Sequence, residues 1–99
     1  MNFKISKAAE NDLEDIWQYT FFNWSADQAD YYFNLILDEI EYLSNYPFSG
    51  QEFGFVKEGY FRSKVKSHFI FYRINDFENV IEIIRILHQK MDFKGKLDD

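Results

Sequence analysis

Residues 58–92 read EGYFRSKVKSHFIFYRINDFENVIEIIRILHQKMD, and most of the predicted sheet lies within this stretch. It contains three runs rich in β-branched and aromatic residues, which predict strands at Tyr60–Val65, His68–Ile74 and Val80–His88. The intervening residues 75–79, NDFEN, favour a turn because Asn and Asp side chains bond readily to their own backbone. We therefore predict three consecutive antiparallel strands.

Alternation along the last of these strands assigns its two faces. Successive side chains of a strand point in opposite directions, so residues two apart share a face. The expected sets are Ile81, Ile83, Arg85 and Leu87 on one face and Val80, Glu82, Ile84, Ile86 and His88 on the other. Neither face is wholly polar, so we expect both to be covered, one by helices and the other by the C-terminal tail or a partner.

Two helical patterns precede this sheet. Phe3 and Ile5 predict a short first strand, after which Ser6 can cap a helix. Ser25 and Gln28 match a capping box at the start of a second, longer helix. The predicted buried stripes are Leu13, Ile16, Trp17 and Thr20 in the first helix and Ala29, Tyr32, Phe33, Ile36, Ile40 and Leu43 in the second. The face of the first helix that we expect to be in water carries Glu10, Asp12, Glu14 and Asp15.

Residues 45–59 predict a loop, because they contain the only proline and three of the four glycines. We expect the rings of Phe48, Phe53 and Phe55 to lie against the domain. These elements together predict one α+β domain spanning residues 1–99. It has an N-terminal strand, a helical hairpin and then antiparallel strands packed against the helices.

Composition narrows the function classes. The chain has no cysteine, which excludes disulfides and thiolate chemistry, and its two histidines make a poor metal site, so we expect neither metal nor cofactor. The first residues, MNFKIS, show no basic leader followed by an apolar stretch, and no segment approaches the ~18 apolar residues of a membrane span. We expect a cytoplasmic protein without a membrane partner.

Charge is unevenly distributed along the chain. The 17 acidic and 11 basic side chains give a formal net charge of -6. Residues 57–73 nevertheless hold five basic side chains against one acidic, a local net charge of +4; the basic ones are Lys57, Arg62, Lys64, Lys66 and Arg73. An acidic protein repels phosphate chains, whereas a local cationic strip can bind one acidic segment. We therefore predict a polypeptide partner and no direct sequence-specific nucleic-acid binding.

Four segments carry a resemblance to a known family. FKISKAAENDLEDIWQYT (3–20) is similar to the first strand and helix of the RelE/ParE superfamily of toxin-antitoxin toxins, and WSADQADYY (24–32) is similar to the start of its second helix. EGYFRSKVKSHFIFYR (58–73) and IEIIRILHQKMD (81–92) resemble its sheet. The segment RILH, Arg85–His88, followed by Met91 and Asp92, is particularly similar to the ParE branch.

The resemblance implies a toxin that a ParD-like antitoxin, encoded alongside it, holds inactive through a C-terminal segment. The implied target is DNA gyrase, whose cleaved-DNA state such a toxin favours by binding, without being a catalyst. Two alternatives stay open. One is a RelE-like ribosome-dependent mRNA endonuclease toxin, and the other is a non-toxic partner-binding member of the same fold.

The basic residues of the Tyr60–Val65 region suggest where an antitoxin binds. Arg62, Lys64 and Lys66 alternate, so they should project to the same side as a cationic row, and with Tyr72 and Arg73 they make up the predicted antitoxin-binding site. Exposed ion pairs contribute about 0 to 1 kcal/mol each, so the aromatic rings must carry most of the affinity. A solvated strand edge, where lysines block unwanted pairing, would show the same row.

An endonuclease would need an acid, a base and cations. Such groups are available in His88, His68, Lys64, Arg62 and Arg85, and His88 ends the last strand near the catalytic groups of ribonuclease members of the superfamily. We favour a structural or partner-contact role for His88 and predict no catalytic residue. Arg85 lies among aliphatic residues, where an unpaired charge is costly, so we expect it to meet a carboxylate, of this chain rather than of a partner.

The tail from Gln89 to Asp99 mixes apolar and lysine residues. It suits a flexible segment that docks its apolar side chains on the sheet, although fraying would also fit the pattern. By resemblance, this region meets the target. The predicted target-binding residues are His88, Met91, Asp92, Phe93 and Leu97.

Overall fold

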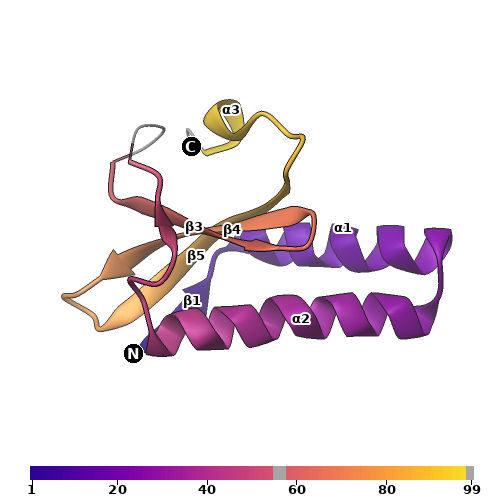
Figure 1. Cartoon of the computed structure of the whole chain (residues 1–99), viewed down its shortest axis with the longest axis horizontal. Helices are drawn as coiled ribbons and strands as arrows, with labels where there is room; N and C mark the ends of the chain where they lie inside the picture. The colour runs from indigo at the N-terminus through magenta and orange to yellow at the C-terminus, as the bar shows by residue number, and fades with distance from the viewer. Residues whose placement is uncertain (55–57, 98–99) are drawn as a thin grey trace.

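The computed structural model describes residues 1–54 and 58–97 (Figure 1). Its elements are β1 (Asn2–Ile5), α1 (Lys7–Asn23), α2 (Ala26–Asn45), β2 (Gln51–Glu52), β3 (Tyr60–Val65), β4 (His68–Asn75), β5 (Val80–His88) and α3 (Phe93–Leu97). The predicted α+β fold is confirmed, with an N-terminal strand, a helical hairpin and antiparallel strands packed on it. The two long helices lie on one side of the sheet and α3 lies on the other (Figure 1). In the described ranges, neither long helix is apolar enough to cross a membrane.

The five strands form one sheet in the order β1-β5-β4-β3-β2. Strands β2 to β5 pair antiparallel, whereas β1 runs parallel to β5. The predicted bounds of β3 and β5 are confirmed, and β4 extends one residue further, to Asn75. The sequence does not predict β2, because a strand of two residues is too short to show alternation.

Two serines start the long helices, as predicted. The hydroxyl oxygen of Ser6 accepts a hydrogen bond from the Ala9 amide at 3.0 Å, and that of Ser25 accepts one from the Gln28 amide, also at 3.0 Å. Each contact satisfies a backbone amide that has no partner inside the helix. The sequence therefore places both helix starts correctly.

The face of the sheet toward α1 and α2 is a closed, mostly aliphatic layer. All aliphatic members of the two predicted helical stripes are buried, and the aromatic members are partly buried. All of these except Trp17 and Ala29 belong to one cluster with Ile70, Tyr72, Ile81, Ile83 and Ile86 of the sheet, which are at most 2% exposed. This layer is the main core.

A β-bulge changes the predicted faces of β5. Tyr72 is opposite Ile83 while Phe71 is opposite Arg85, so β5 has one extra residue, Ile84, at this point. Ile81 and Ile83 face the helices as one predicted set, but beyond the bulge Ile86 continues that face in place of Arg85 and Leu87. The predicted alternation is therefore wrong for the second half of β5, because an inserted residue shifts every later side chain to the other face.

The opposite face of the sheet carries an aromatic layer beneath α3. Phe71 is fully buried, Leu97 of α3 is 2% exposed, and the ring centroids of Phe93 and Phe71 are 4.9 Å apart. The tail therefore docks apolar side chains on the sheet, as expected. Residues 93–97 of the tail form a short helix and not a flexible segment, because ring contacts with Phe53 and Phe69 hold Phe93 in place.

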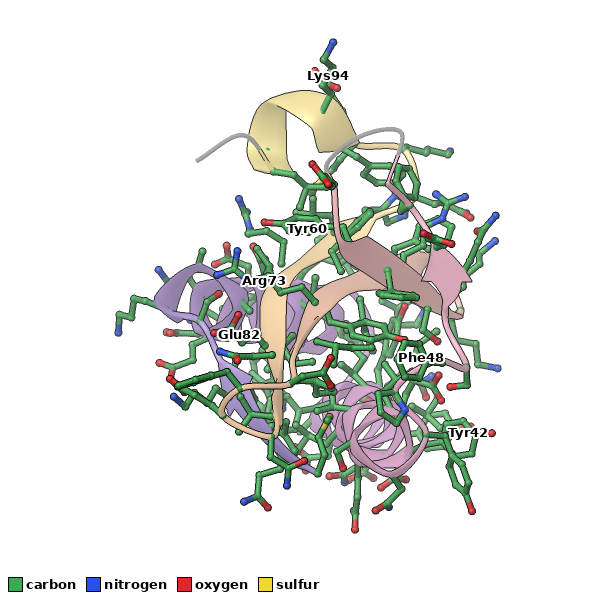
Figure 2. The ribbon with its side chains drawn as sticks, turned by 90° about the vertical axis from the view of Figure 1, so that its left-hand side faces the viewer. Tyr42, Phe48, Tyr60, Arg73, Glu82 and Lys94 are labelled. Carbon is green, nitrogen blue, oxygen red and sulfur yellow. The ribbon has the colours of Figure 1, made fainter. Side chains whose placement is uncertain are left out.

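The loop before β3 holds its phenylalanines differently from one another. Phe53 is 4% exposed and packs edge-on against Phe71, with ring centroids 5.6 Å apart. Phe48 contacts the ring of Phe61 but stays 71% exposed, so the prediction that it lies against the domain is wrong for most of its surface (Figure 2). Phe55, and Lys57 of the basic stretch, lie outside the described residues.

Candidate functional site

The cationic row on β3 has two members instead of three. Arg62 and Lys64 point to the face of the sheet that carries α3, where both approach the ring of Phe69. Lys66 lies beyond β3, in the two-residue turn before β4, with a backbone φ of 54°. The prediction is wrong for Lys66, because a turn residue with left-handed backbone does not continue the alternation of a strand.

Aromatic rings hold Arg62 in place. Its guanidinium carbon lies 4.1 Å from the centroid of the Phe53 ring and 4.2 Å from that of Phe69, and its Nε donates to Oε1 of Gln51 at 3.0 Å. The Nζ of Lys64 lies 5.7 Å from the centroid of the same Phe69 ring. Burial lowers the pKa of Arg62 from its ordinary value, yet arginine stays protonated in proteins at neutral pH. The charge is thus fixed in position.

Two further residues of the predicted antitoxin site already have partners within the chain. Arg73 Nε lies 2.5 Å from Glu82 Oε1 across β4 and β5, and Figure 2 shows the two side chains together. Tyr72 is fully buried; its hydroxyl donates to the Pro47 carbonyl at 2.8 Å and accepts the Gly50 amide hydrogen at 3.1 Å. Burial raises the pKa of Tyr72 to about 12. A core ring cannot contact an antitoxin, so the prediction for Tyr72 is wrong.

Arg85 is neutralised by α1. Its Nε and Nη2 donate to the two carboxylate oxygens of Asp12 at 2.8 and 2.9 Å, and Oδ2 of that carboxylate also accepts the Ile86 amide at 2.9 Å. β1 ends at Ile5, which pairs with Ile83, so the Ile86 amide has no β1 partner and donates to Asp12 instead. The expected internal carboxylate for Arg85 is confirmed. The prediction that Asp12 lies in water is wrong, since its side chain is only 12% exposed.

Both histidines lie in a groove of about 550 Å³ on the helix side of the sheet, between the second half of α1, the start of α2, the start of β4 and the end of β5. His68 Nδ1 lies 2.6 Å from the Tyr32 hydroxyl, and His88 Nδ1 accepts the Lys90 amide hydrogen at 3.1 Å. Burial, followed by the charge of His88, lowers the pKa of His68 from 6.5 to about 4. His68 is therefore neutral at neutral pH.

Exposed apolar side chains surround this groove. Tyr19 of α1 and Trp24 between the helices are 63% and 67% exposed, with ring centroids 6.1 Å apart, and Met91 beyond β5 is 45% exposed. No function was predicted for the rings at this end of the hairpin. A signal exists in residues 17–24, WQYTFFNW, where five rings in eight residues exceed what one buried helical stripe can hold.

The groups of the predicted endonuclease set do not come together. His68 and His88 line the groove on the helix side, whereas Arg62 and Lys64 lie on the α3 side, and Arg85 is committed to Asp12. Cleavage of a phosphodiester needs its acid, base and cations within reach of one phosphate. Here the sheet separates them. In residues 1–54 and 58–97, no three His, Asp or Glu side chains gather closely enough to hold a metal ion.

The predicted target-binding residues are likewise divided. His88 and Met91 line the groove, and Asp92 is exposed beside it in sequence. Phe93 is partly buried and Leu97 is 2% exposed, because both pack on the α3 side of the sheet. Leu97 cannot contact a target unless α3 detaches, so the prediction for Leu97 is wrong for this conformation.

Known proteins resemble the chain over almost its whole length. Residues 3–93 match the family described as the ParE toxin of the type II toxin-antitoxin system, parDE. Two curated relatives, both named Toxin ParE1, come from Mycobacterium tuberculosis and Caulobacter vibrioides. They are 34% and 36% identical to this chain over 95 residues, which is 96% of this chain and 96% of each relative.

A solved structure agrees with the fold. A chain titled as the chromosomal ParDE TA system from P. aeruginosa superimposes with a TM-score of 0.77 and 18% identity, covering 89% of this chain and 95% of that one. At this identity the likeness concerns the fold alone. The family match and the curated relatives carry the assignment: this chain belongs to the family of ParE toxins of type II toxin-antitoxin systems.

Proposed function

We propose that this ParE-family toxin acts by binding proteins and not by catalysis. A ParD-like antitoxin neutralises it in the cytoplasm, and the free toxin inhibits DNA gyrase. Support for the antitoxin comes from the parDE system named in the family description and from the ParDE system named for the similar solved chain. Support for a gyrase-type target comes from the resemblance of residues 85–92 to the ParE branch.

The separation of the titratable groups is the observation that carries the non-catalytic proposal. The two histidines are on one face of the sheet, and the cations Arg62 and Lys64 are on the other. The sheet that separates them is part of the hydrophobic core, so the two sets of groups cannot meet while the protein is folded. A substrate phosphate on either face would therefore meet only part of the chemistry that its cleavage needs.

The surface near the groove has the character of a protein contact. Tyr19, Trp24 and Met91 expose large apolar side chains around a concave region, while the neutral His68 adds no charge to it. Interfaces concentrate binding energy in buried aromatic side chains near their centre, and tryptophan and tyrosine are the commonest such residues. We place the gyrase contact here, because this groove also contains His88 and Met91 of the predicted target-binding residues.

A supercoiling assay tests the target. Purified wild-type toxin should inhibit supercoiling of relaxed plasmid by gyrase, and Trp24→Ser should need about 10-fold more toxin for the same inhibition, as expected when an interface loses a major anchor. Phe77→Ser is the matched control: Phe77 is fully exposed in the turn at the other end of β4, so its loss should leave inhibition unchanged. Full supercoiling at saturating wild-type toxin removes gyrase as the target.

Two further experiments separate the alternatives. Cleavage of transcripts in a translating extract, abolished by His88→Ala, would establish the endonuclease and contradict our proposal. Induced expression without antitoxin should arrest growth. Unimpaired growth at confirmed expression would leave a non-toxic binding protein of the same fold.

A further inference from the structure

We propose that Arg62 and Lys64 form a binding site for a carboxylate side chain of the antitoxin, with the guanidinium of Arg62 as its centre. This inference rests on the proposed function, because its occupant belongs to the antitoxin. The site lies on the face of the sheet that carries α3, with Lys64 as a second, more exposed cation beside Arg62.

The geometry around Arg62 favours an anion. The rings of Phe53 and Phe69 lie close to the guanidinium at 4.1 and 4.2 Å, and Gln51 takes up Nε. Among the described residues, Nη1 and Nη2 have no hydrogen-bond partner, and these two donors at the end of the planar fork match the two oxygens of one carboxylate. Holding the side chain in advance reduces the entropy lost on binding.

Neither cation forms an ion pair with a carboxylate of residues 1–54 or 58–97. Four other cations of the described chain form ion pairs: Lys4 with Glu78, Lys7 with Glu10, Arg73 with Glu82 and Arg85 with Asp12. In the part of the chain that the structure describes, neither Arg62 nor Lys64 lies within ion-pair distance of a carboxylate. Lys64 shares the Phe69 ring with Arg62, so the two positive charges reinforce each other at one place.

A carboxylate fits this site better than a nucleic-acid phosphate. The chain carries a formal charge of -6, which disfavours the approach of a long phosphate polymer, whereas one acidic side chain on an otherwise apolar segment meets little repulsion. The ring of Phe69 is only partly buried, so apolar neighbours of that acidic residue have a surface to cover. Arg62 with its two flanking rings therefore suits an acidic residue of the antitoxin that has apolar neighbours.

The test is the affinity of purified toxin variants for the antitoxin whose reading frame adjoins the toxin gene. Arg62→Gln should raise Kd about 10- to 100-fold, the range for loss of hydrogen bonds to a charged group. Arg62→Lys keeps the charge but loses the planar fork, and should raise Kd at least about 5-fold. Lys64→Gln should raise Kd about 3-fold, as a more exposed ion pair would. The control, Lys7→Gln, removes an equal charge from α1 and should change Kd less than about 2-fold.

Failure of the carboxylate site and failure of the proposed function give different results. Circular dichroism spectra and melting temperatures of each variant show whether it is folded, and Arg62→Lys provides the comparison if Arg62→Gln is not. Tight wild-type binding with both Arg62 variants unaffected overturns the carboxylate site and leaves the proposed function standing. No binding of wild-type toxin overturns the proposed antitoxin and, with it, this occupant. If Arg62→Gln instead weakens binding of a fluorescent single-stranded RNA and not of the antitoxin, the site binds phosphate and the inference is overturned.

Discussion

The two faces of the sheet are built from different side chains and do different things. The face under α1 and α2 is mainly aliphatic, closed by two long helices of 17 and 20 residues. The face under α3 is mainly aromatic, and a helix of only five residues covers it. Branched aliphatic side chains are stiff and fill a closed core, whereas flat rings can also support cations at an open margin. The first face therefore mainly stabilises the fold, apart from the groove at its His68 and His88 end, and the second combines packing with a charged surface.

Two arginines show the same contrast. Arg85 lies at the edge of β5, with its side chain 20% exposed, and Asp12 neutralises it through a two-pronged contact. Arg62 lies on β3 between two rings, which fix its position but leave its charge for a partner. The residue type is identical, and the surrounding side chains alone separate a structural arginine from a candidate binding residue.

The largest expected change in the free energy of unfolding comes from shortening one buried side chain on each face of the sheet. Ile40→Ala, in the closed core, should lower the free energy of unfolding by about 3 kcal/mol through lost burial and a cavity. Leu97→Ala should cost about 1 to 2 kcal/mol, because α3 can detach while the rest stays folded, which limits the loss to its docking free energy. Urea unfolding followed by circular dichroism measures both. Equal losses would show that α3 folds as one unit with the core and would remove this contrast between the faces.

The next largest loss of stability is expected from breaking the largely buried ion pair between Arg85 and Asp12. Asp12→Ala removes the carboxylate that accepts from Nε and Nη2 of Arg85 and from the Ile86 amide, and should cost about 3 kcal/mol, as breaking one side of a largely buried pair does. Glu14→Ala, an exposed position on the same helix, is the control and should stay within about 0.5 kcal/mol of wild type. A loss below about 1 kcal/mol for Asp12→Ala would mean that water replaces the carboxylate.

The half-buried, neutral His68 on the helix side should make the free energy of unfolding fall as the pH is lowered. Unfolded histidine takes up a proton near pH 6.5, whereas folded His68 does so only near pH 4, so lowering the pH between these values favours the unfolded state. Wild type should lose about 1 to 2 kcal/mol more than His68→Gln over this window, a figure reduced from the full shift because solvent screens a half-exposed ring. Stability is measured by urea unfolding at several pH values. Parallel curves for the two proteins would contradict the lowered pKa.

The smallest effect belongs to the ion pair between Arg73 and Glu82. It joins two neighbouring strands where the side chains are 51% and 24% exposed. A double-mutant cycle with alanine at both positions should give a coupling of about 0.5 to 1 kcal/mol, and less at high salt. A coupling above about 2 kcal/mol would place this pair with Asp12 and Arg85, and exposure would then not explain the difference between them.

The sequence by itself predicts the order of the two long helices and the four longer strands, with most of their bounds, but not the short elements β2 and α3. Helix caps at Ser6 and Ser25, apolar stripes and strand alternation all depend on residues a few positions apart, and such local preferences survive folding unchanged. The need of Arg85 for a carboxylate also follows from its apolar neighbours. The identity of that carboxylate does not, because Asp12 is 73 positions away in the chain.

Tertiary structure decides which side chains share a face and which have partners. The bulge at Ile84 turns His88 toward the groove and away from Arg62 and Lys64, which separates the groups that a nuclease would need to combine. No local pattern reports such a one-residue insertion, because it is defined by pairing with another strand. The same holds for the burial of Tyr72 and for the rings around Arg62. Each depends on contacts between distant segments, and only the folded chain brings those segments together.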